Sequence, residues 1–415
     1  MRPLPDHLHD ERLGAFGTLL ADPEPPLAAA LEAAGGRLLS AVPRQIGWAP
    51  GRHVTVRYDA SVRWGDGELD EMLVATCGTE PPGGLRLEGP DQPVTVWRVP
   101  HDPWLPGLAS VLDLAGAAQL LDDLGAGLGT VSHRIVAYRP GRRAVVRLRR
   151  GSASVFVKVV RPDRAEQLHR RHLAAEPVLP VPRSLGFAAD AGIVVLEALP
   201  GTVLRSALGG STRPGADVLL DVLDRMPEPP DGHRAPGWQA TSFGALLSRV
   251  RPDLADRIDA IQAANREAEE AYEAPLVPVH GDFHEAQLLV RGRRITGVLD
   301  IDTLAVGHRV VDLATMVGHL STLALGRGHR AAERYAVELL RRFDAVVDPA
   351  ALRSAVSSVV LGLATGPFRV LGDDWERRTG ERIELAEAWA ESARRVDAGR
   401  ERGLMPASGS AHVHR

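Results

Sequence analysis

The sequence has almost no lysine and almost no cysteine. Lys158 is the only lysine among 49 basic residues, and Cys77 is the only cysteine. A single cysteine excludes an intrachain disulfide and a thiolate zinc cluster. No apolar run approaches the roughly 20 residues that cross a bilayer, and the first residues lack the basic-then-apolar order of a signal peptide. These absences predict a cytoplasmic protein without a membrane partner.

An excess of positive charge is also missing. The 53 acidic residues outnumber the 49 basic ones, and the formal net charge is −4. Nucleic-acid-binding proteins usually carry a basic stripe, so the composition does not favour that class. A GC-rich coding bias explains the arginine excess but not the one lysine. Because arginine cannot replace a compact ammonium charge at every phosphate, Lys158 is a candidate for such a site.

The order of apolar patterns predicts an α+β fold. A chain of 415 residues exceeds what one hydrophobic core usually supports, so two lobes are expected. Alternating apolar residues predict strands at 54–58, 94–97, 134–138, 144–148 and 154–160. Helical spacing predicts helices at 27–39, 217–226, 243–261, 331–343, 352–363 and 382–395. The N-terminal part of the chain is thus strand-rich and the C-terminal part is helix-rich, with the junction near residues 197–201.

Four segments follow from this order. They are an N-terminal extension at 1–130, a sheet lobe with its hinge at 131–200, a helical lobe at 201–402 and a disordered tail at 403–415. Within the first two, Pro-Gly-Arg at 50–52 with Val-Arg at 56–57 recurs 90 positions later. This echo indicates either two strand-turn-strand units of similar composition or a partial duplication. In the second case, only the later copy leads into a lysine-bearing strand.

The segment with the most chemical content is residues 279–302. His280-Gly281-Asp282 precedes an amide, Gln287, and Asp300 follows thirteen residues after that amide. Phosphoryl transfer needs one carboxylate that accepts the proton of the attacking hydroxyl and hard oxygen ligands that hold magnesium. A hairpin of 287–290 with 295–300 would bring Gln287 and Asp300 together at one end. The segment therefore favours magnesium-dependent phosphoryl transfer.

These motifs resemble those of the aminoglycoside phosphotransferase and choline kinase-like family. The matching elements are His-Gly-Asp at 280–282, the amide at 287, Leu-Asp at 299–300 and Asp-Leu-Ala at 312–314. The resemblance implies a bilobal protein-kinase-like fold, with residues 131–200 as the nucleotide-binding lobe. It also implies a kinase that uses ATP and Mg²⁺ to phosphorylate a hydroxyl of a small molecule.

The resemblance implies a role for each matching residue. Asp282 would be the catalytic base, Gln287 and Asp300 would bind magnesium, and His280 and Asp312 would hold the catalytic loop. Lys158 would contact the α- and β-phosphates of the nucleotide. The other candidates on the nucleotide side are Glu166 as the partner of Lys158, with Glu176 as the alternative, and Gly141, Arg142, Glu197 and Leu199.

The sequence leaves two classes of molecule as the phosphate acceptor. An aminoglycoside-type antibiotic or an amino sugar, with antibiotic resistance as the outcome, is the favoured acceptor. A maltokinase-like sugar is the alternative, because bacterial maltokinases resemble this chain in having Gln where the family usually has Asn. The carboxylates predicted to meet the acceptor are Glu285, Asp374 and Asp302, and Asp302 could instead bind a second metal. The nucleotide preference, the role of the first 130 residues and the choice between monomer and homodimer stay undecided.

Two other functions compete with the kinase. A metal-dependent hydrolase would use His280, Asp282 and His284 as ligands, since they have His-x-Asp-x-His spacing. That function would leave Lys158 and Asp300 without a role. A nucleotide-binding pseudokinase would result if Gln287 failed to hold magnesium.

Overall fold

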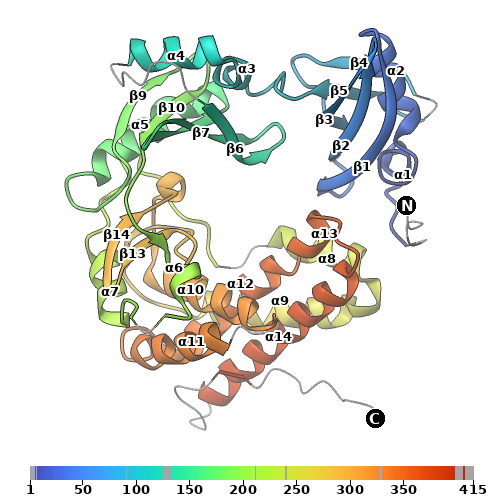
Figure 1. The fold of residues 1–415 in the computed structure, drawn as a ribbon. Coiled ribbons are helices and arrows are strands. Elements are labelled where there is room, and N and C mark those ends of the chain that lie inside the picture. Colours follow the sequence, from blue (N-terminus) through green and yellow to red (C-terminus); the bar gives the residue numbers. More distant parts are fainter. Residues whose placement is uncertain are drawn as a thin grey trace. The chain divides into compact units, whose positions relative to one another are not determined.

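The computed structural model describes residues 5, 7–89, 91–124, 132–210, 212–238, 241–326, 330–397 and 405–406. The predicted disordered tail at 403–415 lies outside these residues, apart from 405 and 406. The chain forms two compact units (Figure 1). The first comprises Met1–His169, Ser184–Ala198 and Phe368–Asp373, and the second comprises Arg170–Arg183, Leu199–Pro367 and Asp374–Arg415. The chain passes between the two units after His169, Arg183, Ala198, Pro367 and Asp373.

The first unit contains two five-stranded antiparallel sheets. The first sheet has the order β1-β2-β3-β5-β4, and helices α1 and α2 pack against it. Its elements are α1 (Phe16–Ala21), α2 (Glu24–Glu32), β1 (Gly36–Ala49), β2 (His53–Trp64), β3 (Gly67–Cys77), β4 (Leu85–Leu87) and β5 (Val94–Arg98). The helix predicted at 27–39 is wrong beyond Glu32. Gly35 has a left-handed φ of 81°, which ends the helical segment and lets β1 begin at the next residue.

The second sheet has the order β6-β7-β8-β10-β9. Buried residues of the loop before α3, of α3 and of α4 pack on one face, and α5 packs on the other. The elements are α3 (Gly107–Leu112), α4 (Leu114–Asp123), β6 (Ser132–Arg139), β7 (Arg143–Arg150), β8 (Ala153–Val160), α5 (Pro162–Ala175), β9 (Ser184–Ala188) and β10 (Ile193–Glu197). The meander predicted at 134–160 is therefore confirmed.

The two sheets repeat the same strand order, including the exchange of the last two strands. They also repeat one aspartate contact. Asp10 Oδ2 accepts hydrogen bonds from Trp48 Nε1 (2.9 Å) and the Gly51 amide (2.7 Å). Asp102 Oδ2 accepts from the Tyr138 hydroxyl (2.7 Å) and the Gly141 amide (2.8 Å). The echo in the sequence thus coincides with two sheets that have the same strand order and the same aspartate contact.

The two copies differ where Lys158 stands. Lys158 pairs with Val145 on β7 and Val194 on β10. The residue at the same register in the first copy is Thr76, which pairs with Thr55 and Thr95. The first copy also has no helix between β3 and β4, whereas α5 separates β8 from β9. The first sheet therefore keeps the scaffold of the second sheet without its lysine and its helix.

The second unit is mostly helical and has one large core. Helix α12 packs against α9, α10 and α14. The helices are α6 (Leu204–Ala207), α7 (Ala216–Asp224), α8 (Thr241–Val250), η1 (Pro252–Leu254), α9 (Ala255–Glu270), η2 (Ile301–Thr303), α10 (Arg309–Ala324), α11 (Arg330–Phe343), α12 (Pro349–Leu363) and α14 (Trp375–Asp397). The short helix α13 (Gly366–Arg369) is divided between the two units after Pro367. The strands are β11 (Thr202–Val203), β12 (Leu276–Val279), β13 (Leu288–Arg291), β14 (Arg294–Val298) and β15 (Ala305–His308). The predicted α+β class, with one strand-rich and one helical part, is confirmed.

One apolar stretch among the described residues is long enough to cross a membrane. It is Pro349–Arg369, and 78% of its most apolar window is buried inside the structure. Such burial is expected for a core helix, because α12 has neighbouring helices on several sides.

Candidate active site

The hairpin of β13 and β14 brings the predicted metal-binding residues together. Leu288 pairs with Val298, so Gln287 and Asp300, one residue before Leu288 and two residues after Val298, lie at the same end. Gln287 Nε2 is 3.3 Å from Asp300 Oδ2 and 3.4 Å from Asp282 Oδ2. Two carboxylates and one amide thus converge from positions that span nineteen residues of sequence.

The loop that carries Asp282 is fixed by its backbone. Both oxygens of Asp312, a buried residue in the first turn of α10, accept hydrogen bonds from the amides of His280 (2.8 Å) and Gly281 (2.9 Å). The Thr303 hydroxyl donates to the His280 carbonyl (2.8 Å). Burial raises the pKa of Asp312, while its contacts with His280 and Gly281 oppose that shift. This carboxylate therefore holds the two residues that precede Asp282.

Gly281 is required by the shape of this loop. Its φ is 80°, in the left-handed region, and a Cβ at this position would lie 2.5 Å from the Thr303 carbonyl oxygen. Any other residue would therefore be strained and would also push η2 away from the loop.

Asp300 has a strained backbone. Its φ of 56° and ψ of 46° are left-handed, which is uncommon for a residue other than glycine. Such strain persists only where the surroundings impose it, and it is concentrated at functional sites. Here the neighbouring Leu299 is fixed through both its backbone groups: its amide donates to the Gln287 carbonyl (2.8 Å) and its carbonyl contacts His280 Nε2 (2.9 Å).

The donor set at this end of the hairpin fits magnesium. Carboxylate and amide oxygens are hard ligands, and a site with few protein ligands leaves room for water and phosphate oxygens. The amide of Gln287 points its nitrogen at the two carboxylates. A half-turn of this amide would present Oε1 instead, and the orientation of an amide follows its hydrogen-bond partners.

Asp282 is partly buried, with 40% of its side chain exposed. This burial raises the pKa of Asp282, His284 and His280 oppose the shift, and the negative charge of Asp300 adds to it. A base whose pKa lies closer to the working pH transfers protons more efficiently.

His280 is not available as a metal ligand. Its Nδ1 accepts from the Asp282 amide (3.2 Å), and its Nε2 therefore carries the hydrogen that points to the Leu299 carbonyl. Since both ring nitrogens are engaged, the ligand set predicted for a hydrolase is not assembled.

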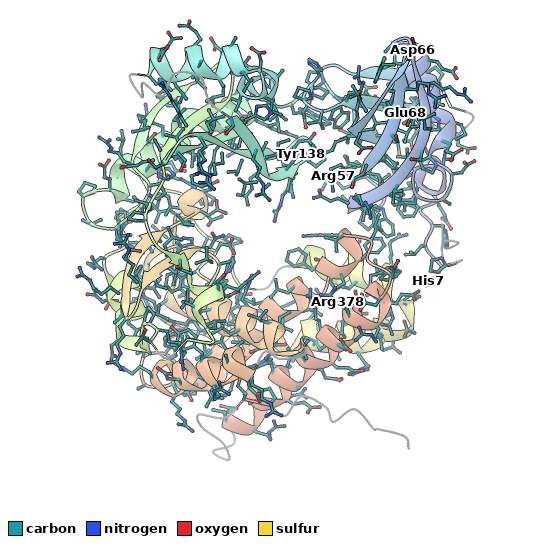
Figure 2. All side chains as sticks on the ribbon, viewed as in Figure 1. His7, Arg57, Asp66, Glu68, Tyr138 and Arg378 are labelled. Atoms are coloured by element: carbon teal, nitrogen blue, oxygen red, sulfur yellow. The ribbon has the colours of Figure 1, made fainter. Side chains whose placement is uncertain are left out.

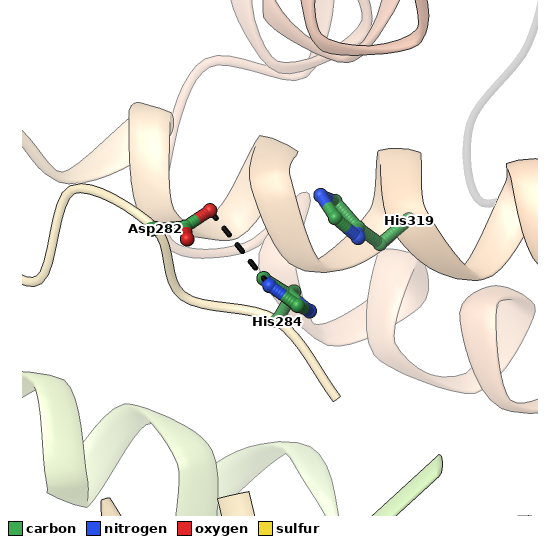
Figure 3. A group of neighbouring side chains, drawn as sticks. All are labelled: Asp282, His284 and His319. Carbon is green, nitrogen blue, oxygen red and sulfur yellow. Dashed lines mark ion pairs between the residues drawn. The ribbon is translucent and has the colours of Figure 1, made fainter. Parts of the chain in front are cut away.

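Asp282 and two histidines form a different group of possible metal ligands. His284 and His319, the latter on α10, each place a ring nitrogen within 4.8 Å of an Asp282 oxygen (Figure 3). The two rings stack at 3.9 Å with an angle of 14° between their planes. Because imidazole lone pairs lie in the ring plane, nearly parallel rings do not direct two lone pairs at one ion. Burial, and then the neighbouring His284, lower the pKa of His319 to about 3, so this ring is neutral at neutral pH.

Glu285 lies behind this triad and faces Arg205, a residue that the sequence did not single out. The Glu285 side chain is fully buried, and its Oε1 accepts from Arg205 Nε and Nη2, both at 2.7 Å. Burial alone would raise the pKa of Glu285, but the hydrogen bond with His284 and the charges of His319 and Arg205 lower it to about 2. Its charge is therefore balanced within the protein, which does not fit the predicted contact with an acceptor.

The other two predicted acceptor contacts also have local partners. Asp374 is exposed and forms an ion pair with Arg377 (2.5 Å). The backbone carbonyl of Asp302 accepts from Arg171 Nη1, and Arg171 also pairs with Asp231 (2.8 Å). Arg171 thus fixes η2 directly after Asp300.

The predicted nucleotide-side residues lie around the second sheet. Lys158 is buried and shares a sheet face with Phe156 and Val160, the face that α5 covers. Glu166 is an exposed residue of α5, and Glu176 follows the end of that helix. Gly141 adopts a φ of 65° in the β6–β7 turn, next to the exposed Arg142. Glu197 ends β10, and Leu199 begins the second unit.

Comparisons with solved structures gave several aminoglycoside phosphotransferases. A thermostable mutant of APH(4)-Ia has 14% identity and a TM-score of 0.45, with 68% of this chain and 98% of that chain covered. The GDP complex of aminoglycoside 2′-phosphotransferase-IIIa has 15% identity and a TM-score of 0.45, with 66% and 99% covered. APH(3″)-Id from Streptomyces rimosus has 18% identity and a TM-score of 0.40, with 60% and 99% covered. Similarities this low carry no argument about the acceptor, and no curated protein matches the chain.

Family membership rests on a stronger match. The model of the phosphotransferase enzyme family matches residues 134–354, more than half of the chain. The matched segment runs from β6 into α12 and contains the hairpin, the loop that carries Asp282 and the buried carboxylate of Asp312. The chain therefore belongs to the phosphotransferase enzyme family, with its protein-kinase-like fold, and is an enzyme of the small-molecule kinase class.

Proposed function

We propose that this enzyme transfers the γ-phosphate of ATP to a hydroxyl of a small polar molecule. The observation that carries the proposal is the convergence of Asp282, Gln287 and Asp300 at one end of a hairpin. Asp282 accepts the proton of the hydroxyl while the oxygen forms a bond to the γ-phosphorus. The bond between that phosphorus and the β–γ bridging oxygen breaks, and ADP leaves. Because the reaction consumes ATP, the enzyme would work in the cytoplasm.

The metal and nucleotide contacts belong to the same proposal. Gln287 and Asp300 would hold magnesium, which neutralises charge on the phosphate oxygens when bound. Lys158 would meet the α- and β-phosphates, with Glu166 orienting it. The Gly141-Arg142 turn would cover the nucleotide, and the backbone between Glu197 and Leu199 would meet the adenine.

The class of acceptor is a separate part of the proposal. An aminoglycoside or amino sugar is a cation, and a pocket for it should be lined with carboxylates. Of the predicted carboxylates, Glu285 and Asp374 are paired with arginines. This pairing favours an acceptor without positive charge, such as a sugar, over an aminoglycoside. A role in antibiotic resistance would follow only for the aminoglycoside.

The test is ATP consumption with magnesium against aminoglycosides, amino sugars, maltose and choline. Asp282→Ala should lower acceptor-dependent turnover about 10²–10⁴-fold while nucleotide binding persists, because the change removes only the base. Asp259→Ala, an exposed aspartate on α9, is the matched control and should keep full activity. Equal turnover of Asp282→Ala and wild type, or no ATP binding by wild type, would refute the proposal.

A further inference from the structure

A cavity of about 940 Å³ lies inside the second unit, next to the proposed base. Its lining includes His319 and Thr322 from α10, Arg205 from α6, and Arg377, Arg378 and Arg382 from α14. His319 also lies within 4.8 Å of an Asp282 oxygen, so one residue of the cavity wall borders the loop that carries Asp282. Small-molecule sites usually have volumes of about 300–1,000 Å³, so this cavity could hold an acceptor whose hydroxyl meets Asp282.

The lining of this cavity is basic. Four arginines and one carboxylate, Glu381, contribute to it. His319 adds no charge, since burial lowers its pKa to about 3. A polycation would therefore meet mainly like charge here, and like-charge contacts disfavour binding.

Three of the four arginines already have carboxylate partners. Arg205 is paired with Glu285, Arg377 with Asp374 and Glu381, and Arg378 with Asp374 at 3.9 Å. These pairs account for part of the positive charge. The pair of Arg378, which is labelled in Figure 2, is the longest of these.

Arg382 is different. Its Nη1 donates to the backbone carbonyl of Leu363 (2.6 Å), and no carboxylate of the described residues forms an ion pair with it. Burial and the neighbouring Arg378 lower the pKa of Arg382 to about 10, although Glu381 opposes the shift. The guanidinium is still charged at neutral pH. A partly desolvated cation next to a second cation is stabilised by any anion that enters the cavity.

We infer that the acceptor carries an anionic group, a carboxylate or a phosphate, which Arg382 and Arg378 bind while its hydroxyl faces Asp282. This inference rests on the proposed function, because it names the acceptor class for the same site. The planar guanidinium suits both anions, since its donors match two oxygens at once. The acceptor is thus a small hydroxylated acid or a sugar phosphate.

The test compares sugars of similar size and different charge. Full-length protein saturated with Mg²⁺ and AMP-PNP is titrated calorimetrically with glucuronate, glucose 6-phosphate, glucose and glucosamine. The saturated nucleotide site keeps glucose 6-phosphate from binding there. Both anions should bind about tenfold or more tightly than glucose, and glucosamine should bind least.

Variants then assign the preference to the cavity. Arg382→Met should remove the advantage of the anions over glucose, and Arg382→Lys should retain part of it. The matched control is Arg394→Met, which removes an exposed arginine of the same helix outside the cavity and should keep the order of affinities. Thermal melting of each variant shows whether Arg382→Met is folded. If it is not, the reduced advantage of the anions over glucose in Arg382→Lys provides the test.

Three results would overturn the inference: glucose or glucosamine binding as tightly as the anions, neither anion binding, or an undiminished advantage of the anions over glucose in the folded Arg382 variants. Failure of the proposed function gives a different result. If Mg²⁺ and AMP-PNP do not bind, the kinase proposal fails, and the same titration without nucleotide still decides whether the cavity prefers anions.

Discussion

At the scale of single residues, the chemistry of the site depends on the environment of Asp282. Burial and the charge of Asp300 raise its pKa, while His284 and His280 oppose the shift. As the proposed general base, Asp282 acts only when deprotonated, so kcat/KM should fall as the pH decreases through this raised pKa. The acid limb of the pH profile should therefore lie above the pH expected for an ordinary aspartate.

The pH profile also tests the contact with His284. Because His284 opposes the rise, His284→Gln should move the acid limb to higher pH. The measurement is kcat/KM from pH 4 to 9 for wild type and variant, with His233→Gln as a control on a residue outside the site. An acid limb at the ordinary aspartate value, or a shift to lower pH in His284→Gln, would contradict the prediction.

The motif residues could be predicted because short-range geometry sets their positions. A tight hairpin fixes which residues face each other, so Gln287 and Asp300 meet whatever the rest of the fold does. No asparagine could take the place of Gln287 at the predicted metal site. Asn265 is the only asparagine in the sequence, and it hydrogen-bonds with Ser357 in the core. His319 and Arg382 lie on helices far along the chain, and nothing local indicates which face of those helices lines the cavity.

At the scale of elements, α10 positions the catalytic loop through Asp312. Asp312→Asn keeps one acceptor oxygen but turns an N–H₂ group toward a backbone N–H. The free energy of unfolding should fall by about 1–3 kcal/mol, since a buried donor loses its partner. The rate should fall as well, because the loop that carries Asp282 loses one of its two anchors. Urea denaturation and steady-state kinetics measure the two effects.

A second buried polar residue of α10 provides the control for this prediction. The Ser321 hydroxyl donates only to the carbonyl of Val317, one turn earlier in the same helix. Ser321→Ala should therefore change stability and rate much less than Asp312→Asn. Equal effects of the two substitutions would mean that Asp312 contributes only as a core residue.

Helix α10 itself was not predicted as a helix. Most of its residues are buried, so it lacks the polar face that produces a helical period. The sequence identified only its Asp-Leu-Ala segment as a motif. The predicted helix at 243–261 is likewise two helices, α8 and α9, separated at Pro252 by a short 3₁₀ turn. Periodicity finds half-buried helices, and it fails where a helix is buried all round or where proline interrupts it.

At the scale of the whole molecule, the repeated strand order of the two sheets is the feature that the sequence only suggested. The echo of Pro-Gly-Arg is short because the constraint is local: Gly51 and Gly141 both have positive φ and both donate their amide to an aspartate. The remaining residues of each copy need only alternate apolar and polar side chains, which many sequences satisfy. The strand order, in which the last two strands are exchanged, therefore could not be predicted from the sequence.

The two sheets should not be equivalent toward nucleotide. Thr76 replaces the lysine in the first copy, and its hydroxyl donates to the Val54 carbonyl (2.8 Å), so it is committed to the sheet. We expect one AMP-PNP per chain by calorimetry. Lys158→Met should weaken binding about tenfold or more, because a charge-assisted contact with phosphate is lost. Thr76→Val should leave affinity and stoichiometry unchanged. Two nucleotides per chain, or weaker binding in Thr76→Val, would mean that the first copy has kept a site of its own despite losing the lysine and the helix.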